Sequence, residues 1–155
     1  MKTGASGTSA TGLTVQIAPG VDVALQPKGS VYVFPVDADA YSLTVPQVVG
    51  AIYFDAASYR ALAAATVTLR VTLSTSNVSY ACNIDLFDQN NLIATPAAEI
   101  AGSNQTSTST TPASVSVDLS TPFRTITGSG LILLRRWSAS YGIPINCFSA
   151  VLTVS

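Results

Sequence analysis

Alternation of apolar and polar residues at every second position constrains the fold of this chain more than any other feature. It runs through five separate segments, at 13–17, 21–25, 66–73, 78–86 and 114–119. Successive side chains of a β-strand point to opposite faces of a sheet, so this period predicts strands with one buried face. The polar positions are mostly Thr and Ser, and β-branched Thr suits an exposed pleated surface. We therefore expect antiparallel sheets.

Four further segments, at 31–36, 48–54, 131–137 and 145–154, are apolar on both faces. Strands of this kind lie in the middle of a fold, or are covered on both sides by a second sheet, a helix or a neighbouring subunit. Pro35 has no amide hydrogen to donate to a sheet, so its strand is expected at a sheet edge or a bulge. Together the two patterns predict about nine short strands.

Turn-forming residues separate these strands. Residues 74–77 (Ser-Thr-Ser-Asn) join two strongly alternating runs, which predicts a β-hairpin over 66–87. Further turns are expected at 88–91 and 128–130, which are rich in Asp, Asn and Gly. The polar, low-complexity residues 102–112 are expected to form an exposed loop between strands.

One short helix is expected, at Ala56–Ala65, where most residues are good helix formers. Asp55 is its candidate N-cap, and Tyr59 and Leu62 share one of its faces. Many short strands, frequent turns and one helix that crosses an end of the sheets predict an all-β fold. The expected architecture is an antiparallel β-sandwich, jelly-roll-like, with one short helix.

The length of 155 residues is enough for one ordinary domain. Residues 1–12 contain only Gly, Ser, Thr, Ala, Met and Lys, which predicts a flexible N-terminal arm. Residues 13–155 are expected to form a single β-sandwich domain. Because no apolar run is long enough for a membrane helix and the first residues have no apolar signal-peptide core, no membrane span is expected.

Charge and composition exclude several functional classes. The net charge is −1, and Lys occurs only at positions 2 and 28, so we expect no direct contact with nucleic acid. The absence of His excludes Ser-His-Asp and Cys-His catalysis and removes the commonest zinc ligand. Glu99 is the only Glu, which leaves few carboxylates for acid–base chemistry. We therefore expect no enzymatic activity, no metal ion and no cofactor.

Two groups of acidic residues raise calcium binding as an alternative. Asp37 and Asp39 form an Asp-x-Asp sequence, and Asp85 and Asp88 precede an Asn-rich turn. Hard cations prefer such oxygen ligands, but neither group has the spacing or the glycine of a calcium-binding loop.

Cys82 and Cys147 both fall within predicted strands and are a candidate disulfide pair. Residues near the middle of two strands of a sandwich can approach within disulfide range. A free cysteine is also a common small core residue, so two buried thiols are the alternative.

Arg135, Arg136, Trp137 and Tyr141 make up the densest cluster of charged and aromatic residues. On a strand, Arg135 and Trp137 share one face and Arg136 points to the other. We rank three interpretations: an interface between subunits, then internal cation–π packing, then a glycan contact.

The favoured function is a non-enzymatic structural subunit of a large homo-oligomeric assembly, either a virion capsid protein or a capsid-decoration protein. Low charge is typical of surfaces that contact identical copies. The strands that are apolar on both faces also have more apolar surface than one small sandwich can bury. The expected partners are copies of itself and another capsid or assembly protein, and the expected location is the virion or an extracellular surface. The alternative is a carbohydrate-binding or adhesin module that is secreted or belongs to a fibre or pilus.

Overall fold

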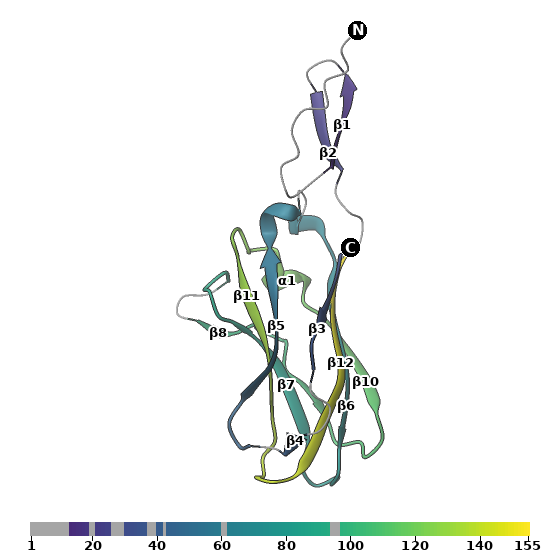
Figure 1. The fold of residues 1–155 in the computed structure, drawn as a ribbon, viewed down its shortest axis with the longest axis vertical. Helices are drawn as coiled ribbons and strands as arrows, with labels where there is room; N and C mark the ends of the chain where they lie inside the picture. The colour runs from purple at the N-terminus through teal and green to yellow at the C-terminus, as the bar shows by residue number, and fades with distance from the viewer. Residues whose placement is uncertain are drawn as a thin grey trace.

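The computed structural model describes the backbone of residues 13–18, 21–25, 30–36, 40–41, 43–59, 62–93 and 97–155. Two antiparallel sheets face each other and form a β-sandwich (Figure 1). Each sheet is named here after one of its inner strands, the β12 sheet and the β11 sheet. The predicted arm at residues 1–12 lies outside the described residues.

The β12 sheet has the strand order β3-β12-β6-β10. Its strands are β3 (Ser30–Phe34), β12 (Pro144–Val154), β6 (Val67–Thr75) and β10 (Ala113–Asp118), and β4 (Ala40–Tyr41) also pairs with β12. The β11 sheet consists of β5 (Gln47–Asp55), β11 (Ser129–Trp137), β7 (Cys82–Asp88) and β8 (Ala98–Glu99), in that order, with β9 (Gln105–Ser107) also paired to β7. The remaining strands, β1 (Leu13–Ala18) and β2 (Val21–Leu25), pair with each other in a two-stranded sheet.

The topology of the sandwich is that of a jelly roll. Strands β8 and β9 pair with different stretches of the same strand β7, so they act as one interrupted strand. With these two counted as one and β4 left aside, the eight strands in chain order give the sheets 1-8-3-6 and 2-7-4-5. This interleaved order is the double Greek key of a jelly roll. The fold predicted from the alternation is therefore confirmed.

All nine segments in which a strand was predicted contain one. Pro35 directly follows β3, which lies at an edge of the β12 sheet, as its missing amide hydrogen predicted. The turn expected at 88–91 is also present, with Asn91 in the left-handed region at φ 56°.

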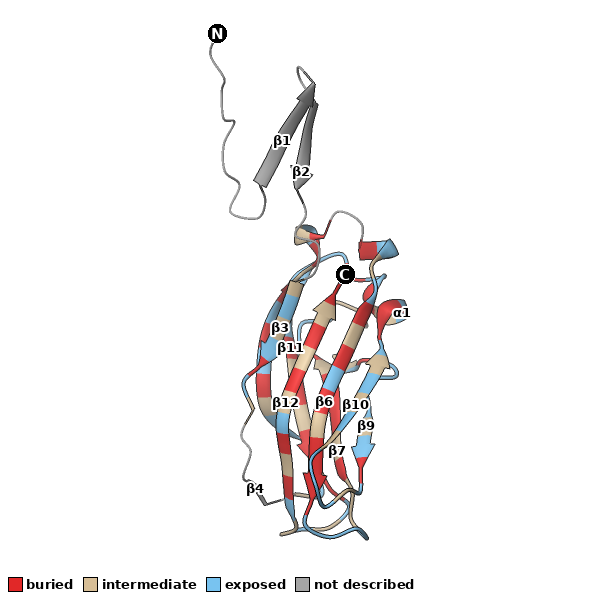
Figure 2. Cartoon of the chain, turned by 90° about the vertical axis from the view of Figure 1, so that its right-hand side faces the viewer, coloured by how far each residue is buried: buried red, intermediate tan, exposed pale blue. Residues whose placement is uncertain are grey.

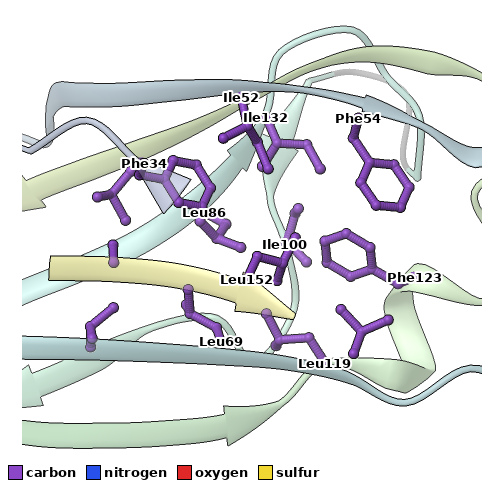
Figure 3. Close-up of a cluster of buried hydrophobic side chains, with 14 of the residues drawn as sticks. Phe34, Ile52, Phe54, Leu69, Leu86, Ile100, Leu119, Phe123, Ile132 and Leu152 are labelled. Carbon is purple, nitrogen blue, oxygen red and sulfur yellow. The ribbon is translucent and has the colours of Figure 1, made fainter. Parts of the chain in front are cut away.

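The core lies between the two sheets, where the inward side chains of both meet (Figure 3). Along most strands buried residues alternate with more exposed ones, as Figure 2 shows. Phe54 of β5 lies at one end of this core, and its ring contacts Phe123 edge to face and Tyr59 in a stacked arrangement, with centroids 5.2 and 5.6 Å away. Burying one large apolar side chain of this kind contributes about 1.5–3 kcal/mol.

The hairpin predicted over 66–87 is wrong. Strands β6 and β7 belong to opposite sheets, and residues 76–81 cross from one sheet to the other. The crossing is held by hydrogen bonds to other segments: the Thr75 amide donates to the Ser109 carbonyl at 2.8 Å, and the Ser76 amide donates to the Pro144 carbonyl at 2.8 Å. Two alternating strands joined by a short turn can bury their apolar faces side by side or face to face. The local pattern is the same in both cases.

The predicted helix at 56–65 is also wrong in its place and type. The structure has two short 3₁₀ segments, η1 (Ala56–Ser58) and η2 (Leu62–Ala64), and its α-helix is α1 (Ser120–Phe123). Asp55 does cap η1, and its side chain accepts a hydrogen bond from the Ala57 amide at 3.1 Å. The chain then turns extended at Tyr59 (φ −115°, ψ 100°), whose hydroxyl lies 2.5 Å from that of Tyr32. Packing of the Tyr59 ring against Phe54 outweighs helix propensity here.

The expected loop at 102–112 contains strand β9 and a buried serine. The Ser103 hydroxyl accepts a hydrogen bond from the Leu86 amide at 2.9 Å and donates to the Leu86 carbonyl at 3.3 Å. It therefore takes up the Leu86 amide between β8 and β9, where the Ile100 amide still donates to the Leu86 carbonyl at 2.8 Å. A polar sequence alone does not reveal such a contact.

Gly50 of β5 passes so close to β3 that it has no room for a side chain. A Cβ atom at this position would lie 2.4 Å from the Pro35 carbonyl oxygen. We expect Gly50→Ala to lower the free energy of unfolding by about 1–3 kcal/mol, because backbone must move to relieve the overlap. In urea denaturation the matched control is Gly128→Ala, whose Cβ would meet only Leu92 Cδ2 at 3.7 Å. Equal effects of the two variants would contradict this account.

Candidate interaction surface

The strand register determines which side chains share the outer face of the β11 sheet. Cross-strand partners of an antiparallel pair lie on the same face. The pairs include Tyr53 with Leu131, Leu133 with Phe87, and Arg135 with Asp85. We call this surface the outer β11 face, formed by Val48, Ala51, Tyr53, Asn83, Asp85, Phe87, Glu99, Thr106, Leu131, Leu133, Arg135 and Trp137.

Seven of the twelve residues of the outer β11 face are apolar or aromatic, and four of these seven are exposed. Tyr53 is 62% exposed, Val48 57% and Leu131 41%, although a solvent-facing strand usually carries polar side chains at such positions. Leu133, the next residue on the same face of β11 after Leu131, is half-buried. The Tyr53 hydroxyl donates a hydrogen bond to Ser129 Oγ at 3.0 Å, which directs the ring across the sheet toward β11.

An ion pair lies within this apolar surface. Arg135 Nε donates to Asp85 Oδ1 at 2.8 Å, and Arg135 Nη2 donates to Asp85 Oδ2. The guanidinium carbon of Arg135 lies 4.2 Å from the centre of the Phe87 ring, within cation–π range. Asp85 is 1% exposed, so the carboxylate of this ion pair is buried. The two charges cancel, and the guanidinium lies over the Phe87 ring.

Glu99 of β8 borders this ion pair at the edge of the sheet. Partial burial of the carboxyl group raises the pKa of Glu99 above its ordinary value of 4.5, and the neighbouring Asp85 raises it further. Arg135 acts in the opposite direction but does not cancel the shift. Glu99 therefore takes up a proton at a higher pH than an ordinary glutamate does.

Arg136 points away from the outer β11 face and is buried between the sheets, 4% exposed. Cys82 and Cys147 are also buried, and both thiols are free in this structure. Burial raises the pKa of Cys82 to about 12 and that of Cys147 to about 11, although Arg136 lowers both. Cys82 Sγ donates to the Asn146 carbonyl at 3.7 Å. Because neither thiol ionises near neutral pH, neither is an activated nucleophile.

The four residues singled out in the sequence do not form one surface. Arg135 and Trp137 share a face and Arg136 points the other way, as the strand period predicted. Arg135 makes internal cation–π and ion-pair contacts, Trp137 is half-buried, and Tyr141 is 76% exposed after the end of β11. An interface or glycan contact through Trp137 and Tyr141 stays a prediction.

Sequence reasoning missed Tyr53, Val48 and Leu131 as surface residues. They belong to segments that are apolar on both faces, and that pattern predicted only that some further layer covers them. The partners of Arg135 were missed because Asp85 and Phe87 lie about fifty residues away in the chain. Only the register between β11 and β7 brings these residues together.

Within the described part of the chain, no three His, Cys, Asp or Glu side chains form a group that could hold a metal ion. Asp37 and Asp39, part of the calcium alternative, lie outside that part. None of the helices in the described ranges is long and apolar enough to cross a membrane.

Removal of Arg135 should expose the cost of burying Asp85. We expect Arg135→Met to lower the free energy of unfolding by about 3 kcal/mol, because the buried Asp85 carboxylate loses the guanidinium that it is paired with. The double variant Arg135→Met/Asp85→Val should recover most of this loss. Chemical denaturation tests both, with Arg70→Met, an exposed arginine of β6, as the control expected to change stability by less than about 0.5 kcal/mol. A double variant as unstable as the single one would refute the explanation.

The raised pKa of Glu99 predicts a pH-dependent contribution to stability. The folded state binds this proton more tightly than the unfolded chain, so stability rises as pH falls through the folded-state pKa and levels off below about 4.5. Relative to Glu99→Gln, the wild-type chain should therefore gain stability between pH 7 and pH 4. Urea denaturation of both chains across this range measures the difference, and a difference independent of pH would count against the shift.

The fold of this chain is similar to that of solved virus-particle structures. No protein-family model matches this chain, and no curated protein matches it. Among solved structures, the crystal structure of the infectious bursal disease virus VP2 subviral particle matches with a TM-score of 0.53 and 16% identity, over 90% of this chain and 36% of that chain. The structure of the Gx strain of the same virus matches with a TM-score of 0.52 and 14% identity, over 90% and 35%.

The structure of T=1 particles derived from the same virus also has a TM-score of 0.52, with 12% identity over 90% of this chain and 35% of that one. This chain therefore spans about a third of the length of the chains that it matches. At such low identity the likeness shows the fold. The structural neighbours that share it are viral capsid proteins.

Proposed function

We propose that this chain is a structural subunit that assembles with copies of itself in a capsid-like particle. The observation that carries the proposal is the jelly-roll sandwich, which matches virus-particle VP2 over 90% of the chain with a TM-score of 0.53. The role is that of a virion capsid protein or a capsid-decoration protein. Its location is accordingly the virion.

The surface chemistry supports assembly. The outer β11 face leaves Tyr53, Val48 and Leu131 open, although a monomeric sandwich usually covers such side chains or replaces them with polar ones. Lys occurs only at positions 2 and 28, so no described strand edge carries the lysines that commonly prevent pairing between sheets of different molecules. Both features favour contact with other subunits.

The same chemistry favours protein partners over nucleic acid and over a catalytic role. Arg135 is paired with Asp85 and Arg136 is buried between the sheets, so two of the four described arginines are unavailable to phosphate groups. The chain has no His, and its two thiols have raised pKa values. We infer that it is not an enzyme, and that its partners are copies of itself and another capsid or assembly protein.

A carbohydrate-binding or adhesin role is the second candidate. It is favoured by the exposed ring of Tyr141, which is 76% accessible beside the end of β11, because sugars stack on open aromatic rings. The jelly-roll fold itself occurs in lectins as well as in capsids. The two roles differ in what the chain binds, so one set of measurements separates them.

Self-assembly is tested on the full chain and on a chain that lacks residues 1–26. We expect the full chain to form species heavier than the 15.9 kDa monomer in sedimentation velocity and electron microscopy. Loss of these species in the truncated chain would show that the predicted arm and the β1–β2 strands connect subunits, as their apolar alternation suggests. Assembly by both chains would show that the sandwich alone makes the contacts. A full chain that stays monomeric but binds a glycan array would instead support the carbohydrate-binding role.

A further inference from the structure

We propose that the outer β11 face is the contact surface through which two copies of this chain pack face to face. This inference rests on the proposed self-assembly and names the surface that carries it. The partner is a second copy of the same chain, which contributes the same face.

The two outer faces of the sandwich differ in part. On the outer face of the β12 sheet, strands β6 and β10 present Thr72, Ser114 and Ser116 alongside the exposed Arg70. The hydroxyls of Thr72 and Ser114 are 3.0 Å apart. The exposed apolar side chains of this sheet belong to Val31 and Val33 of the edge strand β3 and to Phe148 of β12. The outer β11 face carries apolar side chains on three neighbouring strands, β5, β11 and β7.

Two side chains of the outer β11 face, Tyr53 and Arg135, are held in place by contacts within the chain. Tyr53 is tied to Ser129 through its hydroxyl, and Arg135 is fixed by two hydrogen bonds to Asp85 and by the Phe87 ring. Ordering a side chain at an interface costs about 0.5–1.5 kcal/mol, and residues that are already ordered avoid this cost. Tyr and Arg are also the residue types enriched among those that dominate binding energy.

The charges of the outer β11 face suit a second copy better than a charged partner. Its central charges, Arg135 and Asp85, neutralise each other. The remaining carboxyl group, Glu99, belongs to the edge strand β8 and so lies at the rim. An acidic or basic partner would find no matching row of charges, whereas an identical face brings a centre that has no net charge. Identical faces related by a twofold axis are the commonest contact between identical subunits.

Two variants of the outer β11 face and two matched variants of the other sheet test this surface in the full chain. Leu131→Lys and Val48→Lys place a charge on the outer β11 face at positions 41% and 57% exposed. Phe148→Lys and Val33→Lys place the same charge on strands of the β12 sheet, at positions 42% and 65% exposed. The four chains are compared by circular dichroism and thermal unfolding, and their self-association is measured by sedimentation over a range of concentrations. All four positions are already accessible to water, so a lysine can extend into solvent without disturbing the core.

We expect the two β11 variants to raise the dissociation constant at least tenfold, and the two β12 variants to change it by less than about threefold. Equal effects of the two pairs, or an effect of the β12 pair alone, would overturn this surface while leaving self-assembly intact. A wild-type chain that is monomeric at every concentration would overturn the proposed function together with this inference.

Charge complementation distinguishes a face that meets itself from a face that meets another surface. Leu131→Lys and Leu131→Glu are each expected to associate weakly, because like charges approach each other across the twofold axis. An equal mixture of the two should recover association to within about threefold of wild type, since opposite charges then face each other. If the mixture stays as weak as either variant alone, the partner surface is not the outer β11 face of a second copy.

Discussion

The fold depends on one constraint: each sheet of the sandwich has a strongly apolar inner side that only the other sheet can cover. Phe34, Leu69 and Leu152 of the β12 sheet meet Ile52, Leu86 and Ile132 of the β11 sheet across this space (Figure 3). The chain crosses repeatedly between the two sheets. Strands β6 and β7, for example, belong to opposite sheets and are connected by residues 76–81 alone. Breaking contact between the sheets would expose both inner faces at once.

The connections between strands also contain hydrogen bonds and close contacts that the local sequence does not predict. The chain between β6 and β7 gives its amide hydrogens to Ser109 and Pro144, which belong to other segments, and so it is not the turn of a hairpin. The Ser103 hydroxyl accepts the Leu86 amide hydrogen, which no strand takes up. At Gly50 the carbonyl of Pro35, which directly follows β3, occupies the place of a side chain. Each of these contacts joins residues that are far apart in the chain.

The two outer faces of the sandwich differ in part. Over β6 and β10 the β12 sheet presents hydroxyl groups to water, while Val31 and Val33 of its edge strand β3 are exposed. The β11 sheet presents Tyr53, Val48 and Leu131 around a neutralised ion pair. The proposed contact between copies rests on this apolar surface of the β11 sheet.

The sequence by itself determined the class of fold and the positions of the nine longer strands, because alternation with a period of two follows from the geometry of a single strand. It also determined that Arg135 and Arg136 point to opposite faces. Only the tertiary structure decided which strands pair and that the region 56–65 contains two 3₁₀ segments. It also decided that Arg135 pairs with Asp85 and lies over the Phe87 ring. These outcomes depend on contacts between residues far apart in the chain. Their free energies do not appear in any local pattern of residues.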